Sequence, residues 1–496
     1  MYISNTDKER EEMLRAIGVS SITELLSQIP QKYLYPEFSL PHDRNNEPLA
    51  HQVSGALPHD SLDEMELRSA LKKSAAKNTG LLSFVGAGAY ERYIPAAVKA
   101  VTARGEFLTA YTPYQAEASQ GILQSIYEYQ SLVCSLFEME ASNASMYDGA
   151  SALAEAARAC VRITSKKQIL YSGAVHPHCL ETLRTYLGGS GEVVGIASDT
   201  CGRGTEPPAL DEPEARCSGR SAAVPYEFIK IRVKNGKTDL SVLEKTIGSD
   251  TACVIAQSPN FFGVIEDMEE ISGIVHKNGA LFAASADPVS LGILAPPGSH
   301  SADFAVAEGQ SLGLPLNYGG PYLGIFTCKK DYIRQMPGRI AGMTRDKDGK
   351  RGFVLTIQAR EQHIRREKSA SNICSNEALC ALAAAVYLTL LGPDGIKELA
   401  LLNAAKASFA ADKLSSIKGI SLKFKEPFFN EFALELPVNA ENLRKALIKS
   451  EKIDIGLPLG LFFPEMKNSL LVAATETKTE EDILRLESAI KRYICQ

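Results

Sequence analysis

The sequence lacks several features that would tie it to a metal, to an oxidising compartment or to a polyanion. Its ten cysteines are scattered over 496 residues, with no Cys-x-x-Cys pair and no tight grouping with histidine. A metal site is therefore not expected, and the cysteines are expected to be reduced thiols in a cytoplasmic protein. Basic residues are not in excess, since the formal net charge is −6. This balance argues against broad binding to nucleic acid or to an anionic membrane.

Long apolar runs are also missing. The most apolar helix-like stretch covers residues 378–391, which is 14 residues, and Gly392 and Pro393 follow as stop signals. A bilayer span needs about 20 apolar residues, so this stretch is predicted to be a buried helix. The first ten residues contain no apolar run, so no secretory signal is expected.

The composition is that of a globular protein of two or three domains, with 45% hydrophobic and 23% charged residues. Residues 1–61 are predicted to form two short helices and an extended arm. The helix starts carry capping boxes, Thr6 with Glu9 and Ser21 with Glu24. Residues 31–60 are rich in Pro, His and Asn, as expected of an arm that wraps a partner or a neighbouring domain.

Residues 62–330 alternate between helical and apolar strand-like stretches, which predicts a large α/β domain with a mainly parallel sheet. The helical stretches are 63–73, 121–136, 150–162 and 269–278, and the strand-like ones are 168–171, 192–196, 252–256, 280–284, 304–307 and 322–327. Residues 197–225, rich in Gly and Pro, interrupt this pattern as an inserted surface loop. Its Cys201 and Cys217 form either a redox switch or two free thiols.

The remainder is predicted to form a connecting helical segment at 331–394 and a small α+β domain at 395–496. In the small domain, residues 431–436 and 470–475 are strand-like and 441–450 helical. Thr479 and Asp482 are spaced to cap a final amphipathic helix.

Sites in parallel sheets lie beyond the carboxyl ends of the strands, and one such end leads into residues 308–324. This segment looks like a cofactor-holding turn but contains no lysine. It resembles the segment of the glycine cleavage system P-protein that carries the lysine binding pyridoxal phosphate (PLP). In an alignment without gaps, the lysine position falls on Gln310. The residues that match the family segment in this alignment are Pro315, Gly319, Gly320, Pro321 and Gly324. An amide cannot form a Schiff base, because its nitrogen lone pair is delocalised into the carbonyl.

Further blocks at 111–121, 143–155 and 348–376 are also similar to the N-terminal half of P-proteins, so the resemblance covers nearly the whole chain except 197–225. A chain of this length resembles subunit 1 (the α subunit) of two-subunit P-proteins. The resemblance implies a fold-type I PLP-dependent transferase-like architecture, a large α/β domain followed by the small α+β domain.

The resemblance also implies partners and an activity. Subunit 2 would carry PLP in an assembly resembling α2β2. That complex would decarboxylate glycine, as a glycine dehydrogenase (decarboxylating), and pass the aminomethyl group to the lipoylated H-protein. This chain alone would be close to inactive.

One candidate functional loop begins with Tyr111 and Tyr114, which bracket a stiff Thr-Pro pair. The polar residues Gln115, Glu117 and Ser119 alternate after it, ahead of a helix start. The loop either lines the mouth of an active site shared with the partner or is a turn packed against the arm.

A vestigial cofactor pocket is expected around four further residues. Asp148 stands where related enzymes bind the cofactor phosphate at a helix N-terminus, so it would cap the helix and repel phosphate. The resemblance places His176 where a histidine stacks on the pyridine ring, although a structural histidine is favoured here. Ala284 replaces the aspartate that pairs with the ring nitrogen, and Asp287 lies three residues on, displaced from that role.

Two other readings stay open from the sequence. The chain could be an autonomous PLP enzyme, such as an amino acid decarboxylase, whose lysine is Lys329 or Lys330, or a structural or regulatory relative without turnover. The mixed charges from Arg360 to Lys368 are either a solvated helix face or a contact for a subunit or for the acidic lipoyl carrier.

Overall fold

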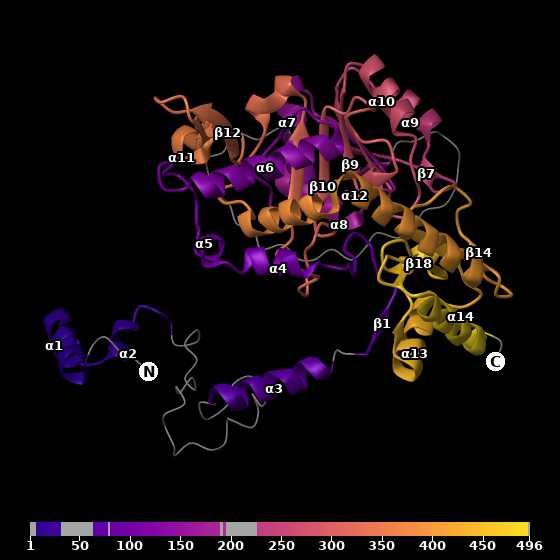
Figure 1. Cartoon of the computed structure of the whole chain (residues 1–496), viewed down its shortest axis with the longest axis horizontal. Coiled ribbons are helices and arrows are strands. Elements are labelled where there is room, and N and C mark those ends of the chain that lie inside the picture. The colour runs from indigo at the N-terminus through magenta and orange to yellow at the C-terminus, as the bar shows by residue number, and fades with distance from the viewer. Residues whose placement is uncertain (1–5, 31–62, 78–79, 189–191, 195–225, 495–496) are drawn as a thin grey trace. The chain divides into compact units, whose positions relative to one another are not determined.

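The computed structural model describes residues 6–30, 63–77, 80–188, 192–194 and 226–494 (Figure 1). The predicted arm at 31–60 and the predicted insertion 197–225, with Cys201 and Cys217, lie outside these residues. Two compact units are distinguished, Met1–Thr79 and Gly80–Gln496. The domain boundaries drawn from the sequence at 61, 330 and 394 stay predictions.

The first unit contains α1 (Asp7–Ile17), α2 (Ile22–Leu25) and α3 (Glu64–Ala76). The predicted capping box at α1 is confirmed, because the Thr6 and Glu9 side chains each accept the other's backbone N–H. Asp63 and Glu66 cap α3 in the same way. No residue of α1 or α3 is buried, so these helices have no core of their own among the described residues.

The second unit is built on an eight-stranded sheet, which confirms the predicted α/β class. The strand order is β2 (Ala141–Ser142), β11 (Gly324–Cys328), β10 (Phe304–Glu308), β9 (Leu281–Ala286), β8 (Thr251–Ser258), β3 (Gln168–Ser172), β5 (Glu227–Ile231) and β4 (Glu192–Val194). The pairs from β10 to β4 are parallel, and β11 is antiparallel to both β10 and β2. Strand β5 was not predicted from the sequence, and it follows directly on the predicted insertion.

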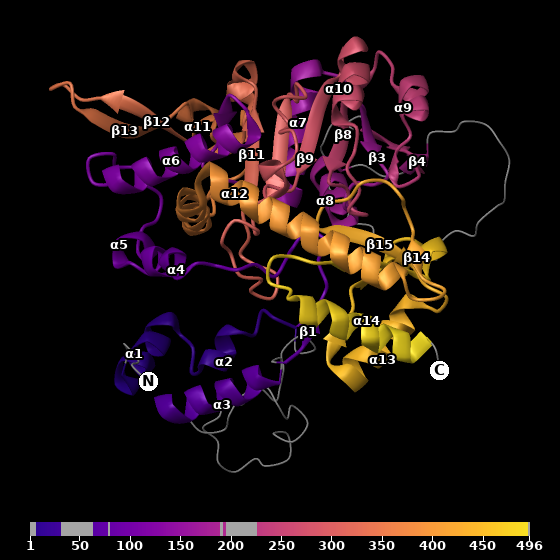
Figure 2. The same cartoon turned by 45° about the vertical axis from the view of Figure 1, so that its right-hand side comes forward.

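Side chains of alternate strand residues point to opposite faces of this sheet and build separate cores. One face is covered by α7 (Gly149–Thr164) and α8 (Pro177–Leu187), which pack on residues such as Ile255 and Val306. The other is covered by α9 (Leu240–Thr246) and α10 (Met268–Lys277), and further along by α6 (Gln120–Phe137) and α12 (Ala378–Ser415). Figure 2 shows this layering from a second direction.

Of the described residues, one helix, α12, is long and apolar enough to cross a membrane by length and composition. Half of its most apolar window is buried inside the protein, where its Ala383, Tyr387 and Leu388 join the core beside α6. The predicted stop at Gly392 is confirmed as an interruption, with φ 60° and ψ −175°, but the helix resumes and continues to Ser415. These contacts support the prediction of a buried core helix.

The predicted connecting segment 331–394 is less helical than its sequence indicated. Much of it forms the β12 (Ile340–Arg345) and β13 (Arg351–Thr356) hairpin, followed by the four-residue helix α11 (Gln362–Arg365) and short 3-10 turns. The charges from Arg360 to Lys368 therefore do not share one helix face. Arg360 itself is buried, and its guanidinium donates to the carbonyls of Met336 and Gly338.

The C-terminal residues form an antiparallel sheet in the order β14 (Ser421–Leu422), β15 (Glu431–Glu435), β18 (Ser469–Ala473) and β17 (Leu457–Pro458). Helices α13 (Ala440–Glu451) and α14 (Glu480–Ile494) share its core with the end of α12. The predicted cap of α14 is confirmed, since Thr479 and Asp482 exchange backbone-to-side-chain hydrogen bonds. Other short α-helices and strands are α4 (Ala96–Thr102), α5 (Gly105–Leu108), β1 (Leu82–Ser83), β6 (Val233–Lys234), β7 (Lys237–Thr238) and β16 (Ile453–Asp454).

Candidate functional site

Gln310, which stands at the expected lysine position, lies just beyond the carboxyl end of β10 and is fully buried. Its side-chain oxygen accepts the N–H of Tyr90 at 2.8 Å, and its nitrogen donates to the carbonyls of Tyr90 at 3.0 Å and Leu314 at 2.8 Å. An amide can bond both the N–H and the C=O of one residue because it carries an acceptor and a donor, whereas a lysine has only donors. Gln310 therefore ties two segments together.

One of these segments, residues 84–95, is named the strap here. It is irregular, with a turn at Ala87 (φ 60°) and Gly88 (φ 91°), and it is hydrogen-bonded both to Gln310 in the loop after β10 and to Glu431 of the C-terminal sheet. The Glu431 carboxylate on β15 accepts the Ala87 N–H at 2.6 Å and the Tyr90 hydroxyl at 2.7 Å. Gly86 fits only because it has no side chain, since a Cβ there would lie 2.2 Å from Glu431. Burial raises the pKa of Glu431 to about 7.

Arg92 fixes the far end of the strap. Its buried guanidinium donates to Asn403 at 2.6 Å and to Glu476 at 2.9 Å, and it lies 4.0 Å from Asp287. The Asp287 carboxylate also accepts the N–H groups of Val289 and Ser290, so it forms the turn after β9. Ala284, three residues earlier, is buried in the core beside α10. The two residues are thus separated, and Asp287 is used as a turn former and as a partner of the strap.

Asp148 caps α7, as the sequence analysis favoured. Its side chain accepts the Ser151 N–H at 2.7 Å, and the Ser151 hydroxyl accepts the Asp148 N–H in return. A second carboxylate, that of Glu308, lies at the same helix end and was not predicted from the sequence. Glu308, the last residue of β10, accepts the Gly149 N–H at 2.9 Å. The helix N-terminus that was compared with the phosphate site of related enzymes is therefore bonded to two carboxylates of this chain.

His176 is a structural residue in this fold. Its Nε2 lies 3.0 Å from the carbonyl oxygen of Ala87 in the strap, and its Nδ1 accepts the His178 N–H. Since Nδ1 accepts, the proton of the neutral ring stands on Nε2 and is donated to the strap. The ring also meets Phe261 edge-on at a centroid distance of 4.8 Å. Burial lowers the pKa of His176 to about 4.

The predicted mouth residues divide into two groups. The Tyr111 hydroxyl lies 3.4 Å from the Ser375 hydroxyl, and the Tyr114 hydroxyl accepts from buried Arg339 at 3.1 Å. Tyr111 and Tyr114 stay 79% and 54% exposed, and of the two Tyr114 lies beside the buried Arg339 guanidinium. Gln115 and Glu117 are exposed and Ser119 is half-buried at the start of α6. The loop packs against the segment that leads into α12.

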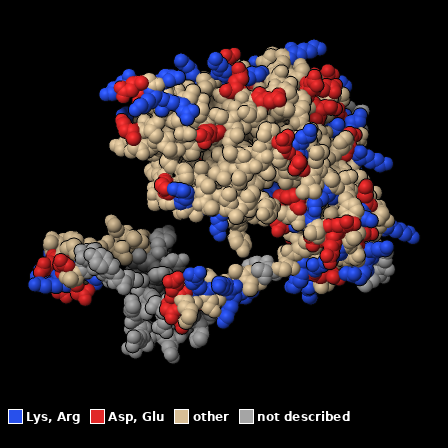
Figure 3. All heavy atoms as spheres, viewed as in Figure 1, with Lys and Arg blue, Asp and Glu red and all other residues tan. Residues whose placement is uncertain are grey.

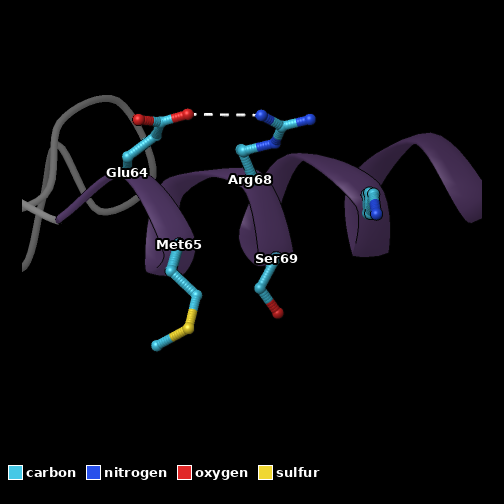
Figure 4. A pocket seen from close by; sticks show the side chains of 5 residues that line it. Glu64, Met65, Arg68 and Ser69 are labelled. Atoms are coloured by element: carbon cyan, nitrogen blue, oxygen red, sulfur yellow. Dashed lines mark hydrogen bonds and ion pairs between the residues drawn. The ribbon is translucent and has the colours of Figure 1, made fainter.

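Two described hollows lie away from these residues. One, of about 500 Å³, is lined by side chains of α3 alone, namely Glu64, Met65, Arg68, Ser69 and Lys72 (Figure 4), where Arg68 pairs with Glu64 at 3.2 Å. One exposed helix cannot enclose a ligand, so this hollow is a surface feature. The other, of about 210 Å³, lies beside α10, and its Glu266 is already bonded to Thr238 and Asn260. Among the described residues, no group of three or more His, Cys, Asp or Glu is arranged to hold a metal ion.

Comparison with known proteins points to the same family as the sequence motifs do. The profile of the glycine cleavage system P-protein family matches residues 1–490. The chain belongs to this family. Two curated relatives carry the name "Probable glycine dehydrogenase (decarboxylating) subunit 1". The one from Chlorobaculum parvum is 44% identical with 97% of each chain covered, and the one from Desulfitobacterium hafniense is 45% identical with 98% of each covered.

Solved structures agree with the P-protein assignment. A crystal structure of a glycine decarboxylase (P-protein) of the glycine cleavage system, in inhibitor-bound form, matches with a TM-score of 0.78 at 39% identity, covering 99% of both chains. A sphingosine-1-phosphate lyase of Burkholderia pseudomallei matches with a TM-score of 0.59 at 13% identity, covering 90% of this chain and 94% of that one. The latter likeness shows the fold alone, and the predicted fold-type I architecture is confirmed.

Proposed function

We propose that this P-protein chain is subunit 1 of a glycine dehydrogenase (aminomethyl-transferring, decarboxylating). It would act with a PLP-bearing subunit 2, decarboxylate glycine, and pass the aminomethyl group to the lipoyl arm of the H-protein. The observation that carries the proposal is the buried amide of Gln310 within a chain that matches subunit 1 relatives over nearly its full length. Decarboxylation with PLP uses a lysine amine that forms a Schiff base with the cofactor, and position 310 supplies no amine.

The surroundings of Gln310 do not fit PLP on this chain. Glu308 bonds the helix N-terminus that would receive the phosphate, and Ala284 offers no carboxylate to a ring nitrogen. His176 donates to the strap. We therefore assign PLP to the partner subunit and derive no chemical step from this pocket. The contribution of this chain is then to shape the shared site, for which Tyr111 and Tyr114 are the candidates.

The surface of the second unit supports a protein partner. In Figure 3, acidic and basic side chains border a broad area without charged residues, which lies mainly over α4, α6 and α12. Exposed apolar side chains include Leu108 at 56%, Leu390 at 51% and, in the loop before β11, Tyr318 at 94%. Large exposed apolar surface usually marks an interaction site.

The rival reading, an autonomous PLP enzyme using Lys329 or Lys330, disagrees with the strand directions. Because β11 runs antiparallel to β10, Cys328 pairs with Phe304, at the start of β10. Lys329 therefore lies at the opposite edge of the sheet from Gln310, where its ammonium pairs with Asp303 at 2.6 Å. An amine at that edge cannot take the place of the missing lysine.

Reconstitution tests the proposal. The purified chain is mixed with PLP, with and without subunit 2 and lipoylated H-protein, and carbon dioxide released from carboxyl-labelled glycine is counted. We expect release only from the complete mixture. Release by this chain and PLP alone would support the autonomous enzyme. No release from a mixture whose subunit 2 is active with another subunit 1 would leave a structural or regulatory role.

A further inference from the structure

Glu308 is the most heavily hydrogen-bonded acid near Gln310. Its carboxylate accepts the backbone N–H groups of Gly149 at 2.9 Å, Gln310 at 2.9 Å and Leu323 at 3.2 Å. These donors come from the N-terminus of α7, the loop after β10 and the residue directly before β11. Three converging N–H groups form the kind of nest that binds anions. Here the anion is a side chain of the protein itself.

The fit between Glu308 and α7 leaves no room for another group. A Cβ on Gly149 would lie 2.8 Å from the Glu308 nitrogen and 3.0 Å from its Cα, so the helix end and the strand end are in direct contact. Burial, opposed by the three N–H groups, raises the pKa of Glu308 to about 7, and the nearby Asp148 carboxylate adds to the rise. A phosphate brought here would meet both carboxylates.

The absence of a lysine at position 310 is not the only feature that opposes PLP binding. Replacing Gln310 with lysine would supply an amine, but the nest of N–H groups would remain occupied, because Glu308 precedes Gln310 by two residues and belongs to the strand. Loss of the amine and occupation of the anion nest are therefore two separate barriers to a phosphorylated aldehyde.

We propose that Glu308 is a built-in anion that takes the place of the cofactor phosphate, and that it excludes phosphate and PLP from this chain even when an amine is restored at position 310. The inference rests on the family assignment but not on turnover of glycine. Its readouts are binding and labelling of this chain by itself, so an inactive complex and a failed labelling experiment remain distinguishable.

The test compares Gln310→Lys with the double variant Glu308→Ala/Gln310→Lys. Each is incubated with PLP, so that the introduced amine condenses with the aldehyde and water leaves. Borohydride then reduces the C=N bond, and peptide mass spectrometry measures the phosphopyridoxyl group at position 310 itself, apart from surface lysines. We expect at least tenfold more label at position 310 in the double variant. Equal labelling in the two variants, or none at position 310 in a folded double variant, would overturn the proposal.

The matched control is Asp148→Ala/Gln310→Lys, which loosens the same helix end but keeps Glu308. It removes one charge but leaves Glu308 in the nest of N–H groups, so its label at position 310 should stay well below that of Glu308→Ala/Gln310→Lys. A measurement without the introduced amine guards against misfolding of these variants. In Glu308→Ala alone, inorganic phosphate should raise the melting temperature relative to chloride of equal ionic strength, while the unmodified chain should show no such rise. A phosphate effect of equal size in both proteins would contradict the assignment of Glu308.

Discussion

Removing the Gln310 amide should release the strap. In Gln310→Ala, the Tyr90 N–H and the Tyr90 and Leu314 carbonyls lose their partners in a buried site. Each orphaned buried group costs about 1 to 3 kcal/mol. Since water can enter the space left by the side chain and compensate in part, we take the local loss as about 3 kcal/mol.

This loss has a local readout. An opening free energy that falls by about 3 kcal/mol corresponds to roughly a hundredfold faster amide exchange, as each 1.4 kcal/mol is tenfold. Hydrogen–deuterium exchange of peptides covering residues 84–95 measures it directly, without assuming that this large protein unfolds in one step.

Ser311→Ala is the matched control. Ser311 is the next residue and is also buried, but no hydrogen bond of its side chain to the described residues is seen, so its truncation should change strap exchange little. Strap exchange that is the same in Gln310→Ala as in the unmodified chain would refute the tie between Gln310 and the strap. So would an equal change in the Ser311→Ala variant.

Three further predictions follow from the pKa shifts and the cap. Because the pKa of Glu308 is about 7 in the folded chain and 4.5 as its ordinary value, the folded state binds more protons between these pH values. The contribution of Glu308 to the free energy of unfolding should therefore fall by about 3 kcal/mol from pH 4.5 to 7.5. Melting curves of Glu308→Gln should lack this loss. Parallel pH profiles of the melting temperature in the two proteins would contradict the prediction. The low pKa of His176, about 4, predicts a neutral ring down to pH 5, read from imidazole NMR shifts, and titration near pH 6.5 would be the opposite result. Asp148→Ala should cost about 1 kcal/mol as a lost cap, with Asp148→Asn largely sparing it; equal melting temperatures for both would remove the cap from the account.

The elements with strong periodicity could be predicted from the sequence. The apolar strands at 168–171, 252–256 and 304–307 and the capped helix after Thr479 all form where expected, because buried parallel strands are continuous apolar runs and caps are local. The β12 and β13 hairpin could not, since its tip from Thr344 to Arg351 is polar and exposed. Nothing in such a stretch marks a buried face.

The candidate site was predictable only where the signal is local. The absence of an amine at position 310 and the cap at Asp148 can be read from neighbouring residues. The roles of Glu431 and Glu308 cannot, because Tyr90 and Glu431 are 341 positions apart and Glu308 and Gly149 are 159 apart. Only the fold brings these groups together, and a lone glutamate carries no pattern. The cytoplasmic location and the contacts with glycine and the H-protein stay predictions.

The most direct test of the central claim is the distribution of PLP in the reconstituted complex. The two subunits are incubated with PLP, reduced with borohydride and separated, and intact masses are measured. The account predicts one phosphopyridoxyl group on subunit 2 and no stoichiometric addition to this chain, because Gln310 offers no amine. One phosphopyridoxyl group per molecule on a single lysine of this chain would contradict it.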